Sequence, residues 1–451
     1  MLTRRHSDPV YLQYIWDVIE CSSADRVCDF DFILQCIRNH RDPKCDAVKL
    51  REQLGNALRD KCISLSGTQY RKTDWSSISI NSGHDSYCFH CHTPGPVVDC
   101  PTCFRVYHES CFKRAFESKT FINFPDECYQ DENNSFKISS SCSTCRRLLN
   151  TRLDKSTTPT DLRAIYSIAL EKMKGKLPWR NLYTVGYVDD VNRNRYFSFK
   201  QMNTRIITDK LRAGPSADGY RNRTHILADL DLLIHNAAVI YGSKAEMTST
   251  ARQIRSLVQK ELYESSLCVD CYLRSKGGKP DPRQIVEPCR KPHSLIWFQY
   301  SSWFFRPCKV LYQNEEGCEV ICFDGRRERQ FVPLNSVVPM SFSASHLGMR
   351  ITAPLKRALT DAQLYVENQR KITPDFSAGE GLVISDVSSE PQELIYSEKN
   401  TNNSSPRHGI KRTRVHNKRK SSSQSKSLPN KNPESEFQSL LFRVGYFLSP
   451  L

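Results

Sequence analysis

The first sixty residues place apolar side chains at the spacing of α-helices. In the segment YLQYIWDVIE, for example, Ile15, Trp16 and Ile19 fall on one helical face,. A polar, strand-like stretch (CISLSGTQYRK) follows. Three helices and a short strand region predict a winged-helix-like domain over 10–74, with a helical protein-interaction module as the alternative. The three helical segments are 11–20, 29–40 and 47–61.

The helical period returns between 158 and 264. The segment TPTDLRAIYSIALEKMKGKL begins with Thr/Asp capping chemistry and carries Leu162, Ile165 and Ile168 at largely helical spacing,. A long irregular stretch, YVDDVNRNRYFSFKQ, separates it from three further helical segments. The pattern predicts a four-helix bundle over 158–264.

Short β-rich runs replace the helices after residue 293. NEEG and DG turns divide 294–338 into several such runs, which predicts a small five-stranded barrel,. A helical segment, APLKRALTDAQLYVENQRK, completes a domain over 294–371. The remaining residues, 372–451, are rich in Ser, Asn, Lys and Glu without periodicity, which predicts a disordered basic tail,.

Length and charge narrow the class of protein. By the usual domain size, 451 residues correspond to about three domains,. The net charge is +16, and the segment 399–431 carries ten Lys/Arg and no Asp/Glu. This charge favours an anionic partner, nucleic acid first, although surplus lysine that only keeps a surface soluble is the alternative. KRTRVHNKRK resembles a nuclear import signal, or else a loose nucleic-acid contact,.

No apolar run approaches the ~20 residues of a membrane span, and the first residues contain no apolar signal segment,. We therefore expect an intracellular protein with no membrane partner. In a reducing compartment most of the 19 cysteines cannot form disulfides,. Pairs of cysteines at CxxC spacing then favour metal.

Eight sulfur or imidazole ligands are concentrated in one stretch of the chain. They form four pairs with two residues between the members of each pair. Eight such ligands are the right number for two closed tetrahedral Zn²⁺ sites, and sites closed in this way leave no position for a catalytic water. The pairs are Cys88 and Cys91, Cys100 and Cys103, His108 and Cys111, and Cys142 and Cys145.

The ligand order, with four residues between Cys103 and His108, resembles a PHD finger, expected over 85–150. The resemblance implies interleaved pairs, because that family alternates them between two zinc ions. Ser140 stands where PHD fingers usually carry Trp. RING-type ubiquitin ligases also interleave two zincs and are the alternative. The implied sets are Cys88, Cys91, His108 and Cys111 at one zinc, and Cys100, Cys103, Cys142 and Cys145 at the other.

The stretch ADLDLLIHNAAVIYG resembles the end of the third helix of a bromodomain. The resemblance implies that Asn236 donates its amide to the carbonyl of an acetyl-lysine. A neutral amide suits a neutral acceptor. Tyr196 matches the loop tyrosine that holds a water beneath that ligand. The alternative role for Asn236 is to cap a helix.

Four further ligands follow the bundle and predict a third tetrahedral zinc site, in a linking finger over 265–293. In proteins that this order of modules resembles, two CxxC pairs stand at this position. Here Val286 stands where the third cysteine is expected. His293 is the substitute ligand, and buried free thiols are the alternative. The four ligands are Cys268, Cys271, Cys289 and His293.

The sequence WFFRPCKV resembles the Pro-Trp-Trp-Pro segment of a PWWP domain. The resemblance implies an aromatic cage for trimethyl-lysine, with Trp303 and Phe323 as two walls. Arg306 stands where the third wall is expected, and Phe305 or Tyr300 could substitute for it. The alternative is that these aromatic residues only form the core of the barrel. Basic residues beside the barrel are predicted to contact DNA phosphates. These are Lys309, Arg326, Arg327 and Arg329.

The order of these modules over 10–371 resembles the MYND-type zinc-finger protein 11 family of chromatin readers. The resemblance implies a multidomain α+β protein of the nucleus, without enzymatic activity, that represses transcription. Its expected partners are the histone H3 tail, at the trimethyl-lysine mark of transcribed gene bodies, nucleosomal DNA and transcriptional corepressors. No cysteine follows Cys322, so the MYND finger of that family is expected to be absent. A zinc-RING-like ubiquitin ligase and a scaffold with inactive reader pockets are the alternatives.

Overall fold

The computed structural model describes most of residues 2–377. The predicted tail from 378 onward, with its import signal, lies outside the described residues, as do Ser140, Arg326, Arg327 and most of the irregular stretch before Tyr196. The interruptions within 2–377 are 23–26, 74–82, 118–123, 125–126, 130–140, 154–156, 177–178, 184, 186–195, 277–281, 302 and 325–328.

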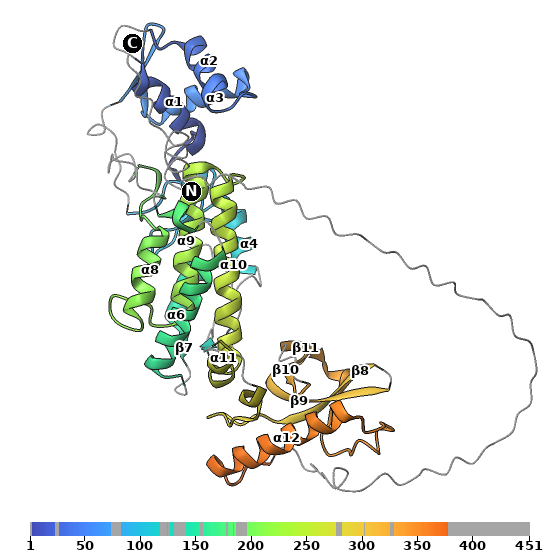
Figure 1. Cartoon of the computed structure of the whole chain (residues 1–451). Coiled ribbons are helices and arrows are strands. Elements are labelled where there is room, and N and C mark those ends of the chain that lie inside the picture. The colour runs from blue at the N-terminus through green and yellow to red at the C-terminus, as the bar shows by residue number, and fades with distance from the viewer. Residues whose placement is uncertain are drawn as a thin grey trace, which may run out of the picture. The chain divides into compact units, whose positions relative to one another are not determined.

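Three short helices and a hairpin form the first part of the chain (Figure 1). Each helix begins at an aspartate whose carboxylate accepts hydrogen bonds from backbone N–H groups of the first turn, which stabilises the helix start,. Their apolar faces meet around Trp16, whose indole N–H donates to the carbonyl of Cys62 at 3.2 Å. The elements are β1 (Leu2–Thr3), α1 (Pro9–Cys21), α2 (Phe30–His40), α3 (Ala47–Arg59), β2 (Ile63–Ser66) and β3 (Gln69–Lys72).

The described residues of the cysteine-rich segment form short strands and helices. Its strands β4 and β5 pair antiparallel. Strand β1, which lies more than 90 residues earlier in the sequence, pairs with β4 and completes a three-stranded sheet. The elements are β4 (Pro96–Asp99), β5 (Val106–Tyr107), α4 (Glu109–Glu117), β6 (Glu127–Tyr129), α5 (Ser143–Asn150) and β7 (Thr151–Leu153).

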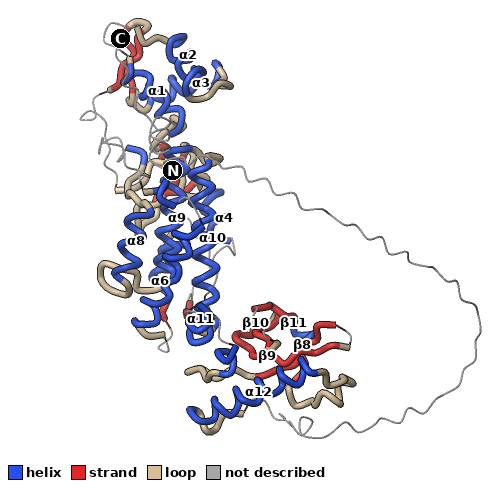
Figure 2. Tube along the Cα trace, viewed as in Figure 1, coloured by secondary structure: helices blue, strands red, loops and turns tan. Residues whose placement is uncertain are grey.

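The described residues between 159 and 267 are mostly helical, as the blue tubes of Figure 2 show. Helix α9 lies at its centre and has buried residues on all sides, so its sequence shows little amphipathic contrast,. Its core is continuous with that of the cysteine-rich segment. The elements are α6 (Pro159–Lys176), η2 (Trp179–Leu182), α8 (Thr204–Ala213), α9 (Arg223–Tyr241) and α10 (Glu246–Leu267).

The last described part is an antiparallel sheet in the order β11-β10-β9-β8-β12, packed against α12. The ends of this order, β11 and β12, are not paired with each other within the described residues, so closure into a barrel stays a prediction. Cys308 and Cys322 lie opposite each other on β9 and β10 and form a disulfide, a pair that the sequence did not single out. The elements are α11 (Val269–Lys276), η3 (Pro282–Val286), β8 (Leu295–Ser301), β9 (Phe304–Gln313), β10 (Gly317–Cys322), β11 (Arg329–Pro333), η4 (Leu334–Ser336), β12 (Val337–Pro339) and α12 (Ala353–Ile372).

The expectation of a multidomain α+β protein is thus confirmed at the level of mixed helices and sheets with several cysteine clusters. No helix in the part of the chain that the structure describes is long and apolar enough to cross a membrane.

Candidate metal centres and ligand sites

The first metal cluster contains Cys88, Cys91, His108 and Cys111. A tight turn presents the first pair, β5 ends beside His108, and α4 supplies Cys111. The Nδ1 atom of His108 lies 3.2 Å from the sulfur of Cys91 and 3.9 Å from that of Cys111. Its Nε2–H donates to the carbonyl of Pro94 at 3.2 Å, which orients the ring and leaves Nδ1 for the metal,.

A glycine makes room for that histidine ring. Gly95 has φ of +137°, and a Cβ atom there would lie 2.9 Å from Nε2 of His108. A side chain would therefore be strained and would also press on the ligand.

The second cluster gathers Cys100, Cys103, Cys142 and Cys145. Cys142 is the cap residue directly before α5, and Cys145 lies in the first turn of that helix. The sulfurs of Cys103 and Cys142 are 3.8 Å apart, and the backbone N–H of Cys142 donates to the sulfur of Cys100 at 3.3 Å. Amide donors of this kind favour the thiolate form that zinc needs.

The third cluster contains Cys268, Cys271, Cys289 and His293. His293 Nε2 lies 3.2 Å from the sulfur of Cys268, while its Nδ1–H donates to the carbonyl of Val310 on β9 at 3.0 Å. The backbone N–H of Cys289 donates to the side-chain carbonyl of Gln369 on α12 at 2.9 Å. Val286 is 4% exposed and packs in the apolar core, so it contributes no ligand.

All three clusters fit Zn²⁺. In each, the four ligand atoms lie within 4.8 Å of one another, and tetrahedral zinc–thiolate geometry places sulfurs about 3.8 Å apart,. Each cluster contains at least one thiol whose pKa is lowered because a neighbouring thiol hydrogen-bonds to it: Cys91 beside Cys88, to about 4, Cys100 beside Cys103, and Cys271 beside Cys268. With four protein ligands each, the sites suit a structural metal, and the prediction that Zn²⁺ is the cofactor is confirmed.

The cysteine-rich finger meets helix α9 through buried polar side chains that the sequence did not reveal. His235, which is fully buried, stacks on Phe89 with ring centroids 4.8 Å apart. Its Nδ1 lies 3.0 Å from Nδ1 of His92, and its Nε2 lies 3.3 Å from a carboxylate oxygen of Asp85. Burial lowers the pKa of His92 to about 2, so this ring is neutral. The finger and the bundle therefore share one interior.

Asn236 is fully buried, and its amide is used within the protein. The Nδ2 donates to the carbonyl of Lys200 at 3.0 Å, while the hydroxyl of Ser198 donates to Oδ1 at 2.8 Å. Tyr196 has other partners: its ring packs edge-on against Trp16, and its hydroxyl contacts the sulfur of Cys62. The structure therefore does not bring the two predicted acetyl-lysine residues to one open pocket, because both side chains already have internal partners.

The residues predicted to form a methyl-lysine cage lie in different environments. Trp303, between β8 and β9, is 84% exposed, whereas Phe323 is 2% exposed and packs against Tyr365. Phe305 is also buried, in the core beneath the sheet. Among the aromatic residues predicted for the cage, Trp303 and the substitute Tyr300, which is 55% exposed, are the ones that reach solvent.

Arg306 has three partners of its own. Its guanidinium lies 2.9 Å from a carboxylate oxygen of Asp324 and 4.0 Å from the ring centroid of Tyr300. Phe304 lies 5.5 Å away on another side of the same guanidinium. A cation of the protein thus already occupies the face of Tyr300 that a cage would offer to a ligand.

The residues predicted to contact DNA are also displaced from that role where they are described. Lys309 is 1% exposed, and its ammonium lies 3.6 Å from the ring centroid of Tyr365. Burial lowers its pKa, and the nearby thiols of Cys271 and Cys289 oppose that shift. Arg329 donates to the carbonyl of Glu264 at 2.8 Å. Neither side chain is free to meet a phosphate, because Lys309 is buried and Arg329 is held by Glu264. The strand pattern in the sequence did not tell which face of the sheet is covered.

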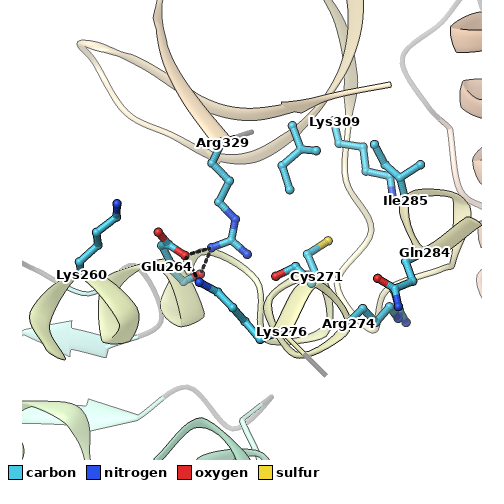
Figure 3. Close-up of a pocket in the computed structure, with 11 residues that line it drawn as sticks. Lys260, Glu264, Cys271, Arg274, Lys276, Gln284, Ile285, Lys309 and Arg329 are labelled. Atoms are coloured by element: carbon cyan, nitrogen blue, oxygen red, sulfur yellow. Dashed lines mark hydrogen bonds and ion pairs between the residues drawn. The ribbon is translucent and has the colours of Figure 1, made fainter. Parts of the chain in front are cut away.

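A cavity of about 520 Å³ lies where α10 and α11 approach the sheet (Figure 3). Its wall is rich in basic side chains, yet most of these have partners. Lys276 lies 3.1 Å from Glu261 and 3.3 Å from Glu264, and Arg329 lies 3.6 Å from Glu264. The basic residues of the wall are Lys260, Arg274, Lys276, Lys309 and Arg329.

No protein-family model matches this chain. The chain is similar to the MYND-type zinc finger-containing chromatin reader Zmynd8 of Drosophila melanogaster, with 21% identity over 296 residues. The similarity covers 64% of this chain and 16% of the relative, so the chain spans a small part of that protein's length.

Proposed function

We propose that this protein is a nuclear, non-enzymatic chromatin reader that binds histone H3 tails and nucleosomal DNA and restrains transcription. The similarity to a chromatin reader over 64% of the chain carries this proposal. Three closed zinc clusters accord with it, because they build rigid binding modules and leave no position for a catalytic water,.

The proposal assigns a role to each module of the chain. The finger at 85–150 is a PHD finger, the bundle at 158–264 a bromodomain, 265–293 a linking zinc finger, and 294–371 a PWWP domain. Modules that bind weakly one by one gain affinity when they engage a nucleosome together, because the first contact raises the effective concentration of the next. Corepressors are further proposed partners.

Methyl-lysine reading is proposed to be weak in this chain. An intact cage holds a quaternary ammonium between three aromatic faces, and here Arg306 brings its own cation to that place,. We expect trimethyl-lysine binding to fall short of that of an intact cage by about 1–2 kcal/mol, the scale of one desolvated cation–π contact. Acetyl-lysine reading is not part of the proposal, since the amide of Asn236 already has partners.

The test is the affinity of the chain for nucleosomes that carry a trimethyl-lysine on histone H3, for unmodified nucleosomes and for free DNA. We expect nucleosomes to bind more tightly than free DNA, and affinity to fall steeply with salt because the chain carries a net charge of +16,. Absence of nucleosome binding at low salt would overturn the proposal.

A trimethyl-lysine H3 peptide tests the cage separately. Arg306→Trp is expected to strengthen binding about tenfold, and Trp303→Ala to abolish it. Trp303 is 84% exposed, so its loss should not unfold the domain, and Phe331→Ala, at a 51% exposed aromatic on β11, is the matched control. If neither Arg306→Trp nor Trp303→Ala alters binding, the sheet does not read this mark.

A further inference from the structure

The outer edge of the finger's sheet is covered by a segment from far away in the sequence. Strand β1 pairs antiparallel with β4, with Leu2 opposite Val97 and Thr3 opposite Pro96. The pairing continues past the strand, because the backbone N–H of Gly95 donates to the carbonyl of Arg5 at 3.2 Å. Without β1, strand β4 would be an edge strand with unpaired backbone groups, which is a template for an added strand.

A charged side chain fixes the register of this added strand. The guanidinium of Arg4 makes two contacts with the carboxylate of Asp99, at 3.1 Å from Nε and 2.5 Å from a terminal nitrogen. The Arg4 side chain is 8% exposed. Asp99 also lies 4.0 Å from His84, and no other ion pair of this carboxylate occurs within the described residues. A two-point contact between guanidinium and carboxylate is both strong and directional.

The residues that follow are held just as firmly. The guanidinium of Arg5 lies 4.0 Å from the ring centroid of Tyr196. The backbone N–H groups of His6 and Ser7 both donate to the carboxylate of Asp60, at 2.9–3.0 Å. The strand is therefore tethered within a few residues of its binding place, and such a short tether gives a local concentration in the millimolar range.

We propose that Leu2–Arg5 is a built-in occupant of the finger's β4 edge, which closes that edge to extended peptides from outside until it is displaced. Strand addition is a general way in which proteins bind extended peptides, through backbone hydrogen bonds and side-chain pockets. Residues 2–5 make both kinds of contact: their backbone pairs with β4, and the side chain of Arg4 binds Asp99. The inference rests on the proposed function only in taking a histone tail as the natural competitor; the occupation itself does not require it.

A labelled peptide with the sequence of residues 1–8, MLTRRHSD, tests the occupation without any histone. Its binding is measured to the full chain, to a chain that lacks residues 1–5, and to Arg4→Glu. The intact chain is expected to bind the peptide at least about tenfold more weakly than the other two, because the resident strand competes at high local concentration. Asp99→Asn in the shortened chain should remove the binding again.

Lys44→Glu, which makes the same charge change at an exposed loop residue of the first part of the chain, is the control and should behave as the intact chain. Hydrogen exchange supplies a second readout: the amides of β4 should exchange faster in Arg4→Glu and not in Lys44→Glu. Zinc content confirms that the finger stays folded in each variant. Equal peptide binding by the intact and shortened chains, or no change in β4 exchange in Arg4→Glu, would overturn the proposal.

Mass measurement in solution separates this occupation from strand exchange between two copies. The intact chain is expected to be a monomer over the concentration range of the peptide assay. A dimer that dissociates in Arg4→Glu would show that the strand comes from a second copy. Nucleosome affinity is measured independently, so loss of nucleosome binding with the peptide result intact would contradict the proposed function and leave this inference standing.

Discussion

The helix bundle joins the finger and the sheet in different ways. Toward the finger, the junction is buried and closely packed, with His235 stacked on Phe89 and the cores of both parts continuous. Toward the sheet, a cavity of about 520 Å³ opens between charged side chains, and a small apolar cluster of Leu267, Leu311 and Ile321 bridges the rest.

The two junctions should therefore differ in how strongly they couple the unfolding of the parts they join. A continuous apolar interior makes two segments unfold together, because exposing one face leaves the other uncovered. A junction of paired charges around a cavity contributes little to stability and tolerates small shifts. We therefore expect the finger and the bundle to behave as one cooperative unit, and the sheet with α12 as another.

Removal of a zinc ligand should have the largest effect and should distinguish the two units. Cys100→Ser leaves an incomplete shell, so we expect loss of one zinc, unfolding of the finger and a lower unfolding temperature of the bundle. Structural zinc contributes on the order of 10 kcal/mol in small fingers. Elemental analysis and thermal unfolding measure both effects. Cys289→Ser is the counterpart, expected to lose one zinc while leaving the finger–bundle transition in place.

His235→Ala tests the buried junction directly. The substitution removes a buried ring and leaves the carboxylate of Asp85, which is 1% exposed, without its imidazole partner. A buried group stripped of its partner costs about 3 kcal/mol. Chemical denaturation of the full chain measures the free energy of unfolding. His225→Ala, near the start of the same helix, should cost less than about 1 kcal/mol, and equal effects at the two positions would argue against a tight junction.

Glu264→Gln tests the charged junction and should have the smallest effect. The carboxylate of Glu264 lies 3.3 Å from Lys276 and 3.6 Å from Arg329, and its side chain is 20% exposed. Partly exposed pairs of this kind contribute about 1 kcal/mol or less, and salt screens them. The loss, measured by denaturation, should shrink between low and high salt. A loss that is large and independent of salt would show a junction as rigid as the other.

Some of this structure could be predicted because its signal is local. Ligand pairs two residues apart indicate metal without any knowledge of the fold, and the structure gathers the predicted ligands into three clusters. Helix starts at Asp8, Asp29 and Asp46 can be identified in the same way. The names of the modules stay predictions, since they depend on a resemblance and not on such local chemistry.

Contacts between distant segments left no signal of that kind. The pairing of β1 with β4 and the stacking of His235 on Phe89 join residues that no periodicity connects. Lys309 and Arg329 lie in β-strands whose alternation was compatible with either face, and the presence of α12 and α10 decided which side was covered. A charged residue in a strand can thus be an internal partner as easily as a surface contact.

The burial of Lys309 links the third metal site to the sheet through charge balance. A zinc ion with three thiolates and a neutral imidazole carries a net charge of about −1, and a lysine ammonium that is 1% exposed lies near the same thiols. Each charge makes the other tolerable away from water. Loss of the ion would leave the ammonium isolated beside Tyr365, at the price of a buried charge without a counterion,. Loss of zinc from the linking finger would therefore also destabilise the neighbouring sheet, because Lys309 on β9 would keep its charge without a counterion.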